Sequence, residues 1–224
     1  MEGTYRWVVF LPCKTTGVGA LNRYYGVFQD GELKLRGIEL RKHDTCGLVN
    51  HVQAAILGEL AKAENATEFM ERLPRVLDIL RAAAVALRQG LVPLQDLVLT
   101  KSVTREIEEY SVFTSVVAAL KQMQHRGFAV HPGESVRFVI TKQSSRDPEA
   151  KVRVAEFLRG DERPDVQEYL KLLARSGETL FAPFGYTEEG LLGELNRTEV
   201  VAALPAAGES LARIGVGYHV APRA

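Results

Sequence analysis

The chain has 224 residues, a formal net charge of zero, 46% hydrophobic residues and 25% charged residues. These values are typical of a water-soluble globular protein with one domain or two small ones. The neutral balance argues against a protein that coats nucleic acid with a uniformly basic surface. A local excess remains, because residues 100–153 hold nine Lys or Arg and six Asp or Glu, and the local field matters more for binding than net charge does.

The cysteines and the apolar runs indicate a cytoplasmic protein. Cys13 and Cys46 are the two cysteines, and they lack the spacing of a metal site. They are interpreted as reduced thiols that fill small core positions, with a reactive thiol as the alternative. No N-terminal stretch has the pattern of a secretion signal, and no apolar run approaches the ~18 residues of a membrane span.

The N-terminal part predicts three strands. Residues 5–11 are aromatic and β-branched and predict a strand that Pro12 ends. Residues 22–38 alternate between apolar and polar on either side of Asp30-Gly31, which is the strongest short-range hairpin signal. Three strands without a covering helix would expose an apolar face. The sheet is therefore expected to be completed elsewhere, or to be covered by the helices that follow.

A two-residue turn fixes the faces of this predicted hairpin. Phe28 would pair with Leu33, and Arg23, Tyr25 and Arg36 would share one face. That face, with the basic cluster at residues 41–43, is a candidate phosphate-binding surface. A solvated antiparallel hairpin with charged residues outside is the alternative.

The chain becomes helical after Asp44-Thr45. Apolar residues at three- and four-residue spacing predict a helix over residues 48–60. Thr67 is predicted to cap a second helix that ends at Gly90 and kinks or splits near Pro74.

The second half predicts a mixture of strands and helices. Residues 95–103 are predicted to be extended and Thr104 to cap a helix. Further elements are expected as a helix over 115–126, a strand over 134–141, a polar loop over 142–150, a short strand or turn over 151–158, and helices over 166–181 and 187–196. Residues 200–224 are poorly patterned and are expected to be loosely ordered.

No enzyme motif is found, and the remaining chemistry is that of binding. The chain lacks a P-loop, a dinucleotide fingerprint, a nucleophile elbow and a His-Glu-x-x-His motif. Lys101, Ser102 and Arg105 supply two cations and a hydroxyl near a predicted helix start, which is how proteins hold phosphates without reading sequence. A capped surface helix with ordinary charges is the alternative. A diffuse positive field is expected from Lys121, Arg126, Arg137, Lys142, Arg146, Lys151 and Arg153.

An ordered set of motifs resembles the end of the palm and the thumb of archaeal family B DNA polymerases. In the first half these are Asn22-Arg23-Tyr24-Tyr25-Gly26, Asp30-Gly31-Glu32, Arg36-Gly37-Ile38-Glu39 and Arg41-Lys42-His43-Asp44-Thr45. In the second half they are Leu99-Thr100-Lys101-Ser102, Glu109-Tyr110, Ala118-Ala119-Leu120, Gly127, Pro132-Gly133-Glu134-Ser135-Val136, Tyr169-Leu170, Leu173 and Pro183-Phe184-Gly185. The catalytic aspartates, the fingers helix and the exonuclease carboxylates of the family are absent. Asn22 and His43 depart from the Lys and Arg that are frequent in the family.

The resemblance implies an α+β chain that acts beside a catalytic one. Residues 1–45 would be a short antiparallel β segment completing a partner's palm sheet, 46–198 a mostly α-helical thumb with a few strands, and 199–224 a loosely ordered tail. The chain would be the small subunit of a split DNA-directed DNA polymerase and inactive alone. It would bind no cofactor, since Mg²⁺ is expected on the large catalytic chain.

The same resemblance implies a set of contacts to primer–template duplex DNA. The expected DNA-binding residues are Arg23, Tyr24, Tyr25, Arg36, Lys42, His43, Lys101, Ser102 and Arg105. Two alternatives stay open: a non-catalytic protein-interaction or regulatory module of thumb ancestry without DNA contact, and a fragment of a one-piece polymerase.

Overall fold

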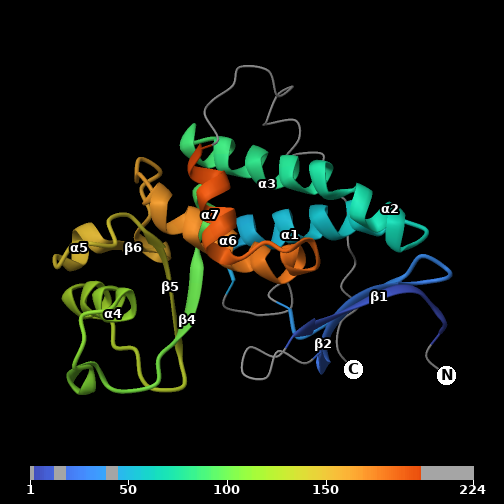
Figure 1. Cartoon of the computed structure of the whole chain (residues 1–224). Coiled ribbons are helices and arrows are strands. Elements are labelled where there is room, and N and C mark those ends of the chain that lie inside the picture. Colours follow the sequence, from blue (N-terminus) through green and yellow to red (C-terminus); the bar gives the residue numbers. More distant parts are fainter. Residues whose placement is uncertain (1–2, 13–18, 39–44, 198–224) are drawn as a thin grey trace. The chain divides into compact units, whose positions relative to one another are not determined.

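The computed structural model describes residues 3–12, 19–38 and 45–197, which divide into two compact units (Figure 1). Unit 1 takes its residues from Met1–Lys42, Val49–Gln89 and Lys171–Ala224, and unit 2 from His43–Leu48 and Gly90–Leu170. Each unit has its own three-stranded antiparallel sheet. Helices and antiparallel sheets together confirm the predicted α+β class. The tail predicted at 199–224 lies outside the described residues.

Unit 1 combines the sheet β1-β2-β3 with helices from two separate stretches of the chain. Its elements are β1 (Tyr5–Pro12), β2 (Gly19–Phe28), β3 (Leu33–Arg36), most of α1 (Gly47–Leu60), α2 (Ala66–Glu71), α3 (Leu73–Arg88), most of α6 (Val166–Phe181) and α7 (Glu188–Arg197). Two buried side chains join the sheet to the rest of the unit: the Trp7 indole donates to the carbonyl of Ala63, just after α1, at 3.0 Å, and the Tyr25 hydroxyl donates to the carbonyl of Leu180 in α6 at 3.1 Å. The helices of unit 1 therefore cover the sheet face that carries Trp7 and Tyr25.

The predicted break in the second helix is confirmed. The helical run splits into α2 and α3, and Pro74 lies in the first turn of α3, where the N–H that proline lacks needs no helical partner. The predicted cap is wrong by two residues. Asn65 caps α2, because its side-chain oxygen accepts the Glu68 N–H at 3.0 Å, and Thr67 lies inside the helix.

Unit 2 combines the sheet β4-β5-β6 with short helices. Its elements include β4 (Leu99–Ser102), α4 (Ser115–His125), β5 (Ser135–Ile140), α5 (Pro148–Lys151) and β6 (Val152–Val154). Tyr169, at the start of α6, ties this unit together: its buried hydroxyl donates to the Leu97 carbonyl at 2.7 Å and accepts the Ile140 N–H at 3.0 Å. Burial raises the pKa of this hydroxyl, so it stays neutral.

Candidate nucleic-acid interface

The predicted hairpin forms, but its strands are paired one residue away from the predicted register. Val27, not Phe28, lies opposite Leu33. The turn contains an extra residue: Gly31 has a φ of +90° and the Phe28 N–H donates to the Glu32 carbonyl at 2.9 Å. This is a three-residue hairpin loop with glycine at the left-handed position, not the predicted two-residue turn. A shift of one residue exchanges the two faces of a strand.

The shift separates residues that the sequence placed on one face. Arg36 lies opposite Tyr24, which in turn lies opposite Phe10, so the three form a row across the sheet. Arg36 is exposed, and within the described ranges its guanidinium makes no hydrogen bond or ion pair. Tyr24 is 8% exposed, and its ring centroid is 5.7 Å from that of Phe10, so it offers little surface to a ligand.

Arg23 and Tyr25 belong to the other side of β2 by strand alternation. The Arg23 guanidinium donates to the Gly37 carbonyl at 3.4 Å, and Gly37 has a φ of +66°. A side chain at Gly37 would place its Cβ 2.9 Å from Arg23 Cγ, so glycine is required there. Tyr25 is fully buried and supports the strand from within unit 1. Its burial raises the pKa of its hydroxyl.

Two expected site residues, Lys42 and His43, lie outside the described residues, and so does Cys13. Cys46 is buried at 1% exposure, in agreement with the predicted core-filling thiol.

The second predicted contact group lies in unit 2. Lys101 and Ser102 are in β4, opposite Val136 and Ser135 of β5. Lys101 is half-buried, whereas Ser102 and Arg105 are exposed. Lys101 and Ser102 thus end the edge strand β4, and Arg105 follows it.

The helix predicted from Thr104 is absent. In its place a single 3-10 turn covers Ile107–Glu109, and the side chains of Glu106 and Glu109 cap it reciprocally. The Glu109 carboxylate accepts the Glu106 N–H at 3.1 Å. A three-residue turn whose N–H groups meet carboxylates offers no helix N-terminus to a phosphate, so that part of the predicted site is wrong.

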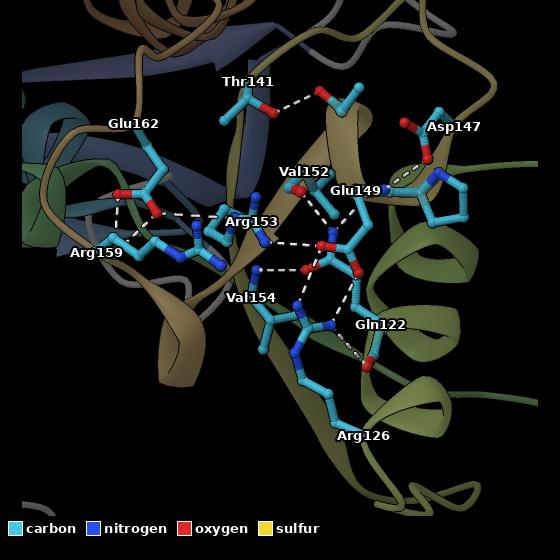
Figure 2. A network of polar contacts seen from close by, with 12 residues as sticks. Gln122, Arg126, Thr141, Asp147, Glu149, Val152, Arg153, Val154, Arg159 and Glu162 are labelled. Carbon is cyan, nitrogen blue, oxygen red and sulfur yellow. Dashed lines mark hydrogen bonds and ion pairs between the residues drawn. The ribbon is translucent and has the colours of Figure 1, made fainter.

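Part of the expected positive field is neutralised inside unit 2. Arg126 and Arg153 both pair with Glu149, at 2.8 and 2.7 Å, around the buried Gln122 (Figure 2). Arg126 also lies over the Phe157 ring, 4.4 Å from its centroid. The Arg126 guanidinium holds the pKa of Glu149 below its ordinary value. These cations stabilise the fold and are less available to a ligand.

The loop between β5 and α5 carries two exposed cations that are not paired in this way. Lys142 and Arg146 are exposed, and neither side chain is bonded to a described residue. The sequence predicts them only as part of a diffuse positive field, because which residues of a polar loop are exposed depends on how the loop folds. The sequence feature that indicated them was the presence of two cations in the predicted polar loop.

The described part of the chain offers no metal site, since it contains no group of three or more His, Cys, Asp or Glu side chains that could hold an ion. Among the same residues, no helix is long and apolar enough to cross a membrane.

Comparison with known proteins connects these features to one family. The family model for DNA polymerase family B matches residues 20–184 of this chain. The chain belongs to DNA polymerase family B. DNA polymerases of Thermococcus sp. (strain 9oN-7) and Thermococcus kodakarensis are each 24% identical, over 170 and 191 residues. These alignments cover 75% and 85% of this chain, but only 21% and 10% of the relatives.

A solved structure gives the same result for the fold. The family B DNA polymerase of Pyrobaculum calidifontis matches with a TM-score of 0.59 and 22% identity, covering 92% of this chain and 23% of that one. The chain thus spans less than a quarter of the length of these family B proteins.

Proposed function

We propose that this chain is the small subunit of a split family B DNA polymerase. Residues 1–45 supply a palm edge that completes the sheet of a large catalytic chain, and residues 46–198 supply a thumb that binds primer–template duplex. The observation that supports the proposal is the family match over 20–184. In the proposal, the catalytic part of the polymerase is supplied by another polypeptide.

The role of the chain in this proposal is positioning. Cations and hydroxyls on the subunit hold the phosphodiester backbone, so that the primer 3′ end meets the metal ions of the partner. The described residues of this chain include no cluster that fits Mg²⁺, and the proposal assigns the metal-dependent step to the catalytic chain.

The proposed contacts differ in how available they are. The exposed groups Arg36, Ser102 and Arg105 support direct contact, and Lys101 precedes Ser102 in β4. Lys42 and His43 remain proposed contacts from sequence alone. Arg23 is proposed as a weaker contact because its guanidinium is bonded to the Gly37 carbonyl. Tyr24 and Tyr25 are buried and are proposed to act by holding β2 in place.

Reconstitution tests the assignment. The subunit is mixed with a polypeptide that carries the catalytic aspartates of family B, and primer extension is measured with each chain alone and with both. We expect no synthesis by this subunit alone and a clear gain in the mixture. Synthesis by this chain alone, or no gain on mixing at concentrations where the chains bind, would refute the proposal. Binding of the partner without any DNA contact would support a regulatory module instead.

Duplex binding by the reconstituted pair tests the palm edge. Arg36→Ala should weaken binding and reduce the log–log salt slope by about 0.9, the contribution of one phosphate contact. Arg175→Ala is the matched control, because Arg175 is an exposed cation of unit 1 outside the hairpin and pairs with Glu188 at 3.4 Å. An identical slope in wild type and Arg36→Ala would show that Arg36 does not contact phosphate.

A further inference from the structure

Lys151 is a buried cation in the described part of unit 2 that has no carboxylate partner there. Lys151 is the last residue of α5 and is 7% exposed. The ammonium donates to the carbonyls of Gln143 and of Ser145, the latter at 3.3 Å, and lies 5.8 Å from the centroid of the Phe113 ring. Burying an ammonium is costly unless it is well hydrogen-bonded. Its partners are therefore the feature that keeps it inside.

Both partners belong to the loop between β5 and α5, and Lys151 also bonds the start of this loop. Its backbone carbonyl accepts the N–H groups of Thr141 and Lys142, each at 3.1 Å. One residue thus bonds the first and the middle part of loop 141–147 at once. Removing the ammonium would leave two loop carbonyls without their donor.

Two further bonds restrict the same loop. The Gln143 N–H donates to Asp165 at 2.9 Å, and the Gln143 side chain accepts the Ser115 hydroxyl at 2.8 Å. A loop held at this many points is preorganised, and a preorganised contact surface loses less conformational entropy when it binds.

The loop presents its polar groups in alternation. Lys142, Ser144 and Arg146 are exposed, whereas Gln143 and Ser145, the residues that Lys151 holds, are half-buried. The nearby carboxylates hold local backbone: Asp147, which ends the loop, accepts the Glu149 N–H at 3.0 Å, and Asp165 accepts that of Gln143. The exposed groups at 142, 144 and 146 are two cations and one hydroxyl, a combination that suits a phosphodiester backbone.

We propose that Lys151 is a positioning residue that holds loop 141–147 in the shape in which Lys142 and Arg146 contact backbone phosphates of duplex DNA. The proposal deepens the proposed function and rests on it. Lys151 itself does not touch the DNA, because its ammonium is turned inward to the loop carbonyls. Its effect on binding must therefore pass through the order of the loop.

The test compares three kinds of variant in the reconstituted pair, by fluorescence anisotropy on primer–template duplex between 50 and 200 mM salt, roughly the range in which phosphate contacts dominate affinity. Lys142→Ala and Arg146→Ala should each reduce the salt slope by about 0.9. Lys151→Met should weaken binding roughly three- to tenfold with the slope unchanged, since it removes order from the loop and no phosphate contact. Lys151→Arg should restore affinity, and Arg163→Ala, which removes an exposed cation elsewhere in unit 2, should change neither quantity.

Amide hydrogen exchange on the full chain supplies a readout that does not depend on DNA. Lys151→Met should speed exchange of the amides of Gln143 and Ser145, with the amides of β5 unaffected. If Lys151→Met does not fold, Ser115→Ala removes another support of the loop and should speed the same amides more weakly.

The outcomes separate this inference from the proposed function. A wild-type pair that does not bind duplex refutes the proposed function, and with it the DNA role of the loop. Normal duplex binding with unchanged amide exchange in Lys151→Met refutes the positioning role alone. A salt slope that falls in Lys151→Met as much as in Lys142→Ala would show that Lys151 contacts phosphate directly, which also overturns it.

Discussion

Replacement of Gln122 by methionine should destabilise unit 2 by about 3 kcal/mol, as worked from three hydrogen bonds. Gln122 is fully buried in α4, and its amide bonds the backbone three times: it donates to the carbonyls of Pro148 at 2.6 Å and Val152 at 2.5 Å, and accepts the Val154 N–H at 3.2 Å (Figure 2). Methionine preserves the volume but none of these bonds. Each buried hydrogen bond contributes about 1 kcal/mol net, and more when its partner is left unsatisfied.

Amide hydrogen exchange in β5 measures this destabilisation, because the single tryptophan, Trp7, lies in unit 1 and its fluorescence follows that unit. The amides of β5 belong to unit 2 and are not bonded to Gln122, so their exchange reports the stability of the unit. In Gln122→Met the slowest of these amides should exchange about a hundredfold faster, the equivalent of roughly 3 kcal/mol. Gln124→Met, at an exposed position of the same helix, is the control. Equal exchange in the two variants would refute the reasoning.

Three more changes test unit 1. Glu59→Gln should flatten the dependence of thermal stability on pH. Burial raises the pKa of Glu59, but hydrogen bonds from three cations outweigh this effect, so the pKa in the folded state lies below the ordinary value of 4.5. The stabilisation by Glu59 is therefore complete above pH 4.5 and is lost as the pH falls through the lower folded pKa. Tyr25→Phe should cost about 1 kcal/mol in urea unfolding followed by Trp7 fluorescence, because it removes the bond to Leu180. Gly26→Ala should cost about 1–3 kcal/mol in the same assay, because its Cβ would lie 2.7 Å from the Trp7 carbonyl oxygen.

The sequence predicts the elements better than it predicts their exact pairing. Hydrophobic periodicity locates the helices around Leu120 and Leu173 and the strand around Phe138, because burial of one face determines both the pattern and the element. The hairpin register depends instead on a single residue in the turn. Asp30-Gly31 is compatible with two- and three-residue loops, and the carboxylate of Asp30 accepts the Glu32 N–H at 2.9 Å in the longer one. Nothing in the alternating pattern distinguishes the two.

The candidate site is predictable to a smaller extent, for a related reason. Residue types show that Lys142, Lys151 and Arg153 are cations, but their availability depends on which partners the fold brings to them. Arg153 is neutralised by Glu149, whereas Lys151 turns inward to carbonyls of the preceding loop. Propensity and spacing carry no information about which lysine of a polar segment becomes buried.

These pairings also change what the neutral net charge means. A chain with equal numbers of cations and anions can still present a cationic face if its charges are unevenly distributed or paired. In unit 2, Glu149 is shared by two arginines, whereas Glu106, Glu109 and Asp165 accept backbone N–H groups and keep their negative charge. The field at loop 141–147 is determined mainly by the nearest charges, which are Lys142, Arg146 and the buried Lys151 against Asp147. The overall balance of charges is therefore no argument against a local phosphate-binding face.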